Sequence, residues 1–96
     1  MSAYLIVDTK IHNDSEYEEY KKRAKPIVEK HGGIYRARGG TLDIIETDLW
    51  TPTRIVIVEF PDVQAARAFV DSEEYAPVKP MRQKNAQCTL FIVDGR

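Results

Sequence analysis

The spacing of hydrophobic residues along the chain predicts four strands and two helices. Runs rich in β-branched and aromatic residues, typical of strands, lie at 4–7, 54–60 and 88–93. Apolar positions at helical spacing separate them, first from Tyr17 to His31 and then from Val63 to Val70. With a further extended segment after the first helix, the predicted order is strand, helix, strand, strand, helix, strand.

The first helix has clear start and stop signals. Ser15 and Glu18 have the spacing of a capping box, and Gly32-Gly33 ends the helical pattern. Pro26 removes one backbone hydrogen bond in the middle of this helix, so we expect a bend there.

The segment after the first helix is extended but contains glycines. Residues 34–38 and 42–46 both read as strand, on either side of Gly39-Gly40. This arrangement predicts one long strand with a bulge or bend at the glycines. Residues 48–53, which include Trp50, are expected to form a loop.

The second helix follows Pro61-Asp62, a helix-start signal. Its buried face is expected to consist of Val63, Ala66, Phe69 and Val70. Ser72 can cap a short turn, and Pro77 and Pro80 then predict an irregular or kinked stretch before the last strand.

This order of elements favours an α+β fold with ferredoxin-like βαββαβ topology and a four-stranded antiparallel sheet, with the first and third strands at its centre. Residues 4–7 and 55–58 are apolar at both odd and even positions, so both faces of these strands are hydrophobic. This predicts that both faces of the sheet are covered. Two helices cover only one face. The favoured solution is a second copy on the other face, forming a dimeric α+β barrel. The alternative is a monomer that buries this face under its long loops.

Composition narrows the classes of protein that fit. The 96 residues suit one domain, 1–96, and a net charge of −1 argues against a nucleic-acid partner. The chain has one cysteine and neither a signal-like start nor an apolar run long enough to span a bilayer. We therefore expect a cytoplasmic protein with no membrane association.

Several short motifs together resemble a known family. They are Tyr17 and Tyr20, His31-Gly32-Gly33, Arg38-Gly39-Gly40, Glu46, the run from Arg54 to Asp62, Ala65 or Ala66, the run from Ser72 to Tyr75, Arg82 and Asp94-Gly95. On these residues, which span nearly the whole chain, the sequence resembles the domain-of-unknown-function family thirteen-thirty, in the dimeric α+β barrel superfamily.

The resemblance implies the ferredoxin-like fold, a homodimer and a polar pocket in each protomer, without an agreed reaction. The superfamily also contains cofactor-free monooxygenases, muconolactone-type isomerases and haem proteins, but a shared fold does not carry function. One departure is Thr47, where family members often have glycine after the residue equivalent to Glu46.

Glu59 is the first candidate for chemistry. If Val56, Val58 and Phe60 face the helices, Glu59 points into the barrel between the two sheets and needs a cationic partner. The available cations are Arg38, Arg54 and Arg82. Glu59 is then either one half of a structural ion pair or, if desolvated, a general base.

Arg38 and Arg54 are candidates to stabilise an anion. Arg38 beside Gly39-Gly40 can present a guanidinium and accessible backbone amides to a small carboxylate or enolate. The alternative is a bent edge strand with an exposed arginine.

Other residues complete the candidate set. His31 is either a proton carrier or, more simply, a helix-end cap. Tyr75 can bring a phenol to the mouth of the pocket, and the resemblance adds Glu46 and Arg82 as ligand-binding candidates. Trp50 is either a lid over the pocket or a residue of core packing or dimer contact. Because no cysteine or second histidine stands at ligand spacing, we predict no metal and no cofactor.

Two functions remain open at this point. The first is a cofactor-independent isomerase or oxygenase acting on a small anionic or enolisable molecule, with Glu59 as base and Arg38 and Arg54 as anion stabilisers. The second is a non-catalytic dimeric module that binds a ligand in the same pocket or has a structural role.

Overall fold

The computed structural model describes residues 2–95. It contains four strands and three helices in this part of the chain, in the order β1 (Ala3–Ile11), α1 (Asp14–Lys30), β2 (Ile34–Arg38), β3 (Ile55–Phe60), α2 (Val63–Val70), α3 (Lys79–Asn85) and β4 (Ala86–Asp94). None of these helices is long and apolar enough to cross a membrane.

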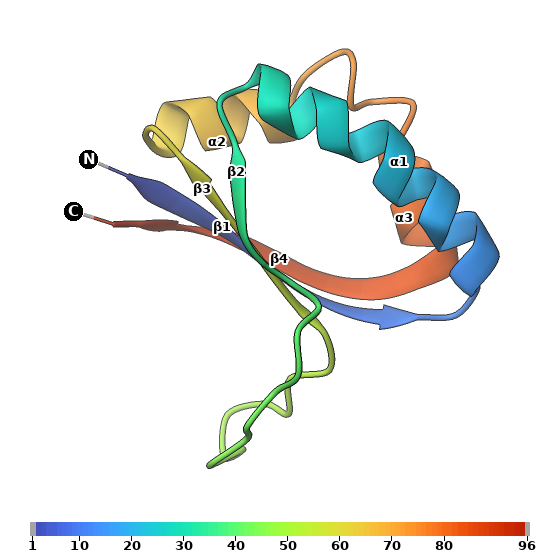
Figure 1. Cartoon of the computed structure of the whole chain (residues 1–96), viewed down its shortest axis with the longest axis vertical. Coiled ribbons are helices and arrows are strands. Elements are labelled where there is room, and N and C mark those ends of the chain that lie inside the picture. The colour runs from blue at the N-terminus through green and yellow to red at the C-terminus, as the bar shows by residue number, and fades with distance from the viewer. Residues whose placement is uncertain (1, 96) are drawn as a thin grey trace.

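The strands form one antiparallel sheet in the order β2-β3-β1-β4. The first and third strands are central, as predicted. The helices lie over one face of this sheet, and the two termini lie side by side at one end (Figure 1). The ferredoxin-like α+β fold with a four-stranded antiparallel sheet is therefore confirmed.

Strand register separates the residues of the sheet into two faces. On the helix-facing side, Leu5 stands between Val58 of β3 and Ile92 of β4, and the buried core continues into Phe60 and Phe69. On the other side, which we call the open face, Ile6 stands between Ile57 and Phe91. The hydrophobic residues of this open face that remain most exposed are Ile34, Phe91 and Val93.

The first helix begins earlier than expected. Its N-cap is Asn13, whose side chain accepts a hydrogen bond of 3.1 Å from the backbone N–H of Glu16, so Ser15 lies inside the helix. Ser15 instead donates its hydroxyl hydrogen to the Asn13 carboxamide. The helix runs through Pro26 to Lys30, since the packed face of Tyr17, Ala24 and Val28 outweighs the one hydrogen bond that proline removes.

The prediction of a long second strand is wrong in its second half. β2 ends at Arg38, and residues 41–47 form no strand. Gly39 takes a left-handed backbone conformation, with φ +75°, and this turns the chain out of the sheet. The bulge lies instead between Tyr35 and Ala37.

The stretch predicted to be irregular contains the third helix. Ser72 caps a turn by accepting the backbone N–H of Tyr75 at 3.1 Å, as expected. Pro80 then lies in the first turn of α3, where a backbone N–H has no partner within the helix and its loss costs little.

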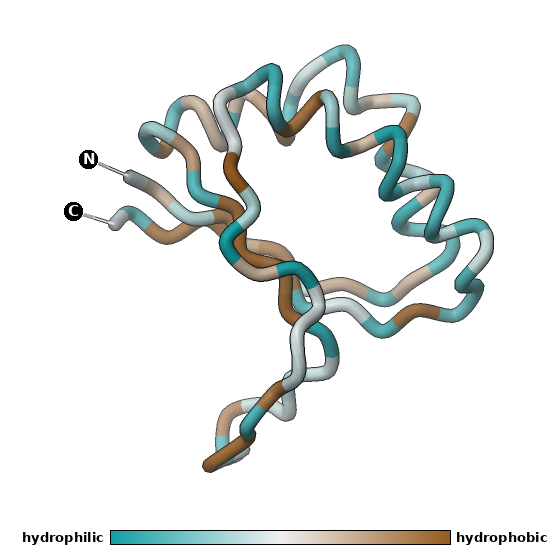
Figure 2. The backbone as a smooth tube through the Cα atoms, in the orientation of Figure 1, coloured by the Kyte–Doolittle hydropathy of each residue, from teal (hydrophilic) through white to brown (hydrophobic). Residues whose placement is uncertain are grey.

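A long segment without regular structure connects β2 and β3. We call residues 41–53 the arm. The arm extends away from the helices, beyond the sheet (Figure 1), and carries apolar residues near its tip (Figure 2).

Candidate functional site

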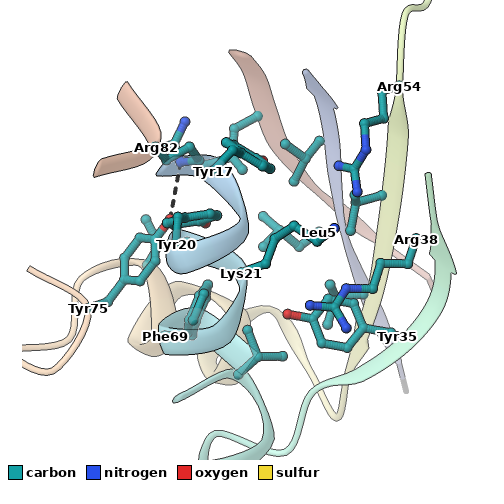
Figure 3. Close-up of a pocket in the computed structure, with 17 residues that line it drawn as sticks. Leu5, Tyr17, Tyr20, Lys21, Tyr35, Arg38, Arg54, Phe69, Tyr75 and Arg82 are labelled. Atoms are coloured by element: carbon teal, nitrogen blue, oxygen red, sulfur yellow. Dashed lines mark hydrogen bonds between the residues drawn. The ribbon is translucent and has the colours of Figure 1, made fainter. Parts of the chain in front are cut away.

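A cavity of about 50 Å³ lies between α1 and the helix-facing side of the sheet. Aliphatic residues from the central strands and aromatic rings from α1, β2, α2 and the turn after it form most of its wall. Polar side chains lie at two separate places, Tyr20, Tyr75 and Arg82 at one end and Tyr35, Arg38 and Arg54 on the strand side (Figure 3).

The inner end of the cavity is a chain of three hydrogen-bonded groups. Arg82 Nε donates to the Tyr75 hydroxyl at 3.1 Å, and the hydroxyls of Tyr75 and Tyr20 are 2.8 Å apart. Arg82 is only 6% exposed, and the ion pairs among residues 2–95 do not include it. A buried guanidinium whose partners are neutral favours an anion nearby.

Burial raises the pKa of three phenols that line the cavity, those of Tyr17, Tyr20 and Tyr35. It raises the pKa of Tyr20, and the neighbouring Tyr75 raises it further. Burial likewise raises the pKa of Tyr17 and of Tyr35. These phenols are therefore hydrogen-bond donors at neutral pH rather than bases.

The mouth of the cavity is cationic. The Arg38 guanidinium lies over the ring of Tyr35, with Cζ 4.4 Å from the ring centroid, and Arg54 faces the ring of Tyr17 at 5.8 Å. Lys21 and Arg38 also line a shallow groove outside the cavity, together with Glu18, Lys22 and Lys25. Cations thus outnumber the single carboxylate along this entrance.

The bulge in β2 places Arg38 at this site. In a regular strand, Tyr35 and Arg38 would point to opposite faces because they are three residues apart. The bulge between Tyr35 and Ala37 adds one residue and so interrupts this alternation, and Tyr35 pairs with Val58 and Arg38 with Val56, both on the helix-facing side.

Gly39 makes room for Arg54. A Cβ atom at Gly39 would lie 2.7 Å from Arg54 Nε, too close for the guanidinium to stay where it is. The backbone of Arg54 is also fixed on both sides, since its N–H donates to Asp8 Oδ1 at 3.0 Å and its carbonyl accepts from the Thr9 N–H at 3.0 Å.

The structure brings together some of the predicted site residues. Arg38, Arg54, Tyr75 and Arg82 all line the cavity, with Gly39 packed beneath Arg54. Gly40 has no neighbour close to the position of a Cβ atom, and Glu46 is exposed in the arm. His31 ends α1 with its Nδ1 3.0 Å from the Ile27 carbonyl oxygen, as the capping interpretation predicts, and is outside the cavity lining.

Glu59 lies on the other side of the sheet. It accepts hydrogen bonds on the open face from the Ser2 hydroxyl and from Arg36 Nε, the latter at 2.8 Å. The expectation that its partner is Arg38, Arg54 or Arg82 is therefore wrong, because the bulge sends Arg36 to the open face and Arg38 to the cavity. The Ser2 hydrogen bond, followed by Arg36, lowers the pKa of Glu59, so this carboxylate stays ionised.

Sequence reasoning gave no role in binding to four residues of the lining, Tyr17, Tyr20, Lys21 and Tyr35. Helical spacing from Tyr17 puts Tyr20 on the buried face, which was the available signal. Sequence reasoning also missed Asp8, which lies outside the lining and holds the backbone of Arg54, and its signal is a carboxylate within the apolar run of a central strand. It accepts hydrogen bonds from Trp50 Nε1 at 2.8 Å and from the Thr53 N–H at 2.9 Å.

Comparison with known proteins assigns the family. Residues 2–96 match the sequence model of the Domain of unknown function family (DUF1330). The chain belongs to this family. None of the curated proteins compared with this DUF1330 chain matches it.

Solved structures similar to this DUF1330 chain share its fold. A protein of unknown function from Rhodopseudomonas palustris has a TM-score of 0.76 at 18% identity, covering 99% of this chain and 82% of its own. SnoaB, a cofactor-independent oxygenase from Streptomyces nogalater, has a TM-score of 0.70 at 14% identity, with 99% and 93% covered. A dimeric ferredoxin-like protein of unknown function from Jannaschia sp. CCS1 has a TM-score of 0.63 at 11% identity, with 98% and 99% covered. At these identities the similarity concerns the fold alone.

Proposed function

We propose that this DUF1330 protein binds a small organic anion in the cavity between α1 and the sheet. One observation carries the proposal: Lys21, Arg38, Arg54 and Arg82 line an otherwise apolar and aromatic cavity, and its lining includes no carboxylate. Lys21 pairs with Glu18 outside the lining at 2.9 Å, but the ion pairs among residues 2–95 include none of the three arginines. Arginines without acidic partners in a partly desolvated site attract an anion far more strongly than the same groups in water.

The geometry also constrains the shape of the ligand. A space of about 50 Å³ is well below the roughly 300 Å³ or more of a drug-sized site, so only a small group enters it without rearrangement. The wall provides aromatic faces and the inner end provides neutral phenols and the Arg82 guanidinium. A small carboxylate or enolate, with any larger part lying in the basic groove outside, fits this arrangement.

Binding is better supported than proton abstraction by the protein. The lining contains no carboxylate or imidazole, and the phenols of Tyr17, Tyr20 and Tyr35 have raised pKa values. Glu59, the predicted base, faces away from this cavity. An isomerase that needs a side-chain base therefore has less support here than a module that binds an anion.

Oxygenation of a bound enolate by dioxygen is the second candidate. It is favoured by the same cationic site, because stabilising an enolate promotes its formation without requiring a strong base. The similarity in fold to SnoaB, which is described as a cofactor-independent oxygenase, is consistent with this candidate.

We also propose that the protein is a homodimer joined through the open face. That face presents the half-buried Ile6 and Ile57 and the exposed Phe91 and Val93, and no helix covers it, since the helices lie on the opposite side. The arm of the same chain extends away from it rather than folding over it (Figure 1), which counts against the monomer alternative. A dimeric protein of the same fold adds support.

Binding is tested by calorimetry with matched ligands. Benzoate, pyruvate and acetoacetate are compared with their uncharged amides, and the carboxylates are expected to bind more tightly. Arg38→Ala and Arg54→Ala should each weaken binding by about tenfold or more, the effect of losing one charge-assisted contact.

Arg67→Ala is the matched control, because Arg67 is an exposed arginine on α2 that pairs with Asp71. It should leave binding unchanged. If all carboxylates and amides bind equally weakly to the parent and to every variant, the anion-binding proposal is rejected. Oxygen consumption measured with an electrode in the presence of any ligand found this way then tests the second candidate.

A further inference from the structure

The arm is longer than a connection between neighbouring strands requires. Residues 39–54 join β2 to β3 without a helix or strand, whereas irregular connections above roughly 12–15 residues are uncommon in compact domains unless they are functional or disordered. Two strands that pair directly need only a short turn. The extra length therefore calls for a role outside the sheet.

Large apolar side chains of the arm face solvent. Ile45 is 86% exposed and Leu49 is 89% exposed, and Ile44 and Trp50 are also exposed. Figure 2 shows hydrophobic residues at the tip, far from the rest of the chain. A cluster of exposed aliphatic and aromatic groups marks an interaction surface, because leaving it in water is unfavourable.

The arm is also held in a defined direction at its base. Trp50 Nε1, the Thr53 N–H and the Arg54 N–H all donate to the Asp8 carboxylate, at 2.8, 2.9 and 3.0 Å. Asp8 shares strand parity with Tyr4 and Ile6, so this anchor lies on the open face. A segment fixed in this way loses less conformational freedom on binding than a free loop does.

We propose that the arm clasps a second copy of this chain, with Ile45 and Leu49 packing against it. This inference rests on the proposed dimer through the open face. The arm and the open face lie on the same side of the molecule (Figure 1), so a copy stacked on that face lies on the side to which the arm extends. A two-fold axis gives each copy the same apolar arm, and the contact closes on itself.

A protein of another kind is the competing occupant. The second copy is favoured because it presents its own uncovered apolar residues Ile34, Phe91 and Val93 on the side that the arm faces. The near-neutral chain, with net charge −1, also repels its own copies little.

Trp50 reports on the arm directly because it is the only tryptophan of the chain. As protein concentration rises, sedimentation measures the dimer fraction and tryptophan emission measures the surroundings of the arm. We expect the emission to shift to shorter wavelength, and acrylamide quenching to fall, in parallel with dimer formation.

The two proposals fail in different ways. A chain that stays monomeric at every concentration removes the dimer and with it the clasp. A dimer whose Trp50 emission and quenching match those of the monomer retains the dimer and overturns the clasp alone.

A double variant checks the contact itself. Ile45→Ser with Leu49→Ser should raise the dimer dissociation constant at least about tenfold, since burying one aliphatic side chain contributes on that order. Val63 was expected on the buried face of α2 but is 39% exposed, at the start of that helix. Val63→Ser therefore removes an exposed aliphatic group on the helix side and should leave the constant unchanged. Circular dichroism confirms that each variant is folded. A double variant that dimerises like the parent overturns the clasp and assigns the arm to another partner.

Discussion

Both faces of the sheet carry rows of apolar residues, but the charged side chains on the two faces differ in whether they have partners. On the open face, Glu59 is matched by Arg36 and Ser2. On the helix-facing side, Arg38, Arg54 and Arg82 surround a cavity whose lining has no carboxylate. Two arginines of the same strand therefore differ in role. Arg36 forms an ion pair with Glu59, whereas Arg38 lines the cavity and has no carboxylate partner there. The sheet thus separates charged side chains that pair within the protein from those available to a ligand.

The largest expected difference between the two faces is in the stability lost when one phenylalanine on each face is replaced by alanine. Phe60 is 1% exposed in the core, and Phe91 is 37% exposed on the open face. Phe60→Ala should lower the free energy of unfolding by about 3–5 kcal/mol through lost burial and a cavity. Phe91→Ala should lower it by less than about 1 kcal/mol in urea titrations at low protein concentration, where the protomers are separate. Equal losses would show that the open face is covered within one protomer.

The next largest effect should come from the inner end of the cavity. Tyr75→Phe removes the hydroxyl that accepts from Arg82 and shares a hydrogen bond with Tyr20. Leaving those buried groups without a partner should destabilise the protein by about 1–3 kcal/mol, measured by urea denaturation. Glu59→Gln on the open face should cost less, since its partner Arg36 is more than half exposed. If Glu59→Gln destabilises the protein more than Tyr75→Phe, the polar contacts of the open face contribute more to stability than those of the cavity.

A smaller effect is expected from replacing Gly39 by alanine, and the same replacement at Gly40 is the matched control. Gly39→Ala places a Cβ atom against Arg54 and forces alanine into a positive φ, so we expect a loss of about 1–2 kcal/mol and weaker anion binding. Gly40→Ala meets nothing within 4 Å and should change neither quantity appreciably. Urea denaturation and calorimetry measure the two effects. If both alanine variants bind alike, Arg54 has no part in the site.

The smallest expected effect is a dependence on pH through Asp8. Burial raises the pKa of Asp8, but hydrogen bonds from Thr53, Arg54, Trp50 and Thr9 outweigh it, so the pKa is lowered from 3.8. A lowered pKa means that the ionised carboxylate stabilises the fold above about pH 3.8 and that this contribution is lost as the pH falls through the lower, folded-state value.

Asp8→Asn tests this contribution. The difference in unfolding free energy between parent and variant should be constant from neutral pH down to about 4 and should shrink below it. Because Trp50 donates to Asp8, the variant should also change the tryptophan emission. A difference that grows on acidification would contradict a lowered pKa for the Asp8 carboxyl.

Local patterns in the sequence were enough to predict the order of the strands and the fold class. Hydrophobic period is a local property, so residues 4–7 and 55–58 could be recognised as strands with apolar residues on both faces. The capping of α2 by Asp62 and of the following turn by Ser72 was equally readable, since each side chain reaches only a few residues along the chain. The family was identified for the same reason, because short motifs carry it.

Which charged side chains line the cavity depends instead on how the strands pair. The bulge in β2 assigns Arg36 and Arg38 to opposite faces, and its position depends on pairing with β3, which no local pattern encodes. Three partners of Asp8, namely Trp50, Thr53 and Arg54, lie more than 40 residues away along the chain. Such contacts depend on which strands pair and in which register, and neighbouring residues in the sequence do not specify this. The same holds for the turn at Gly39, where the arm leaves the sheet.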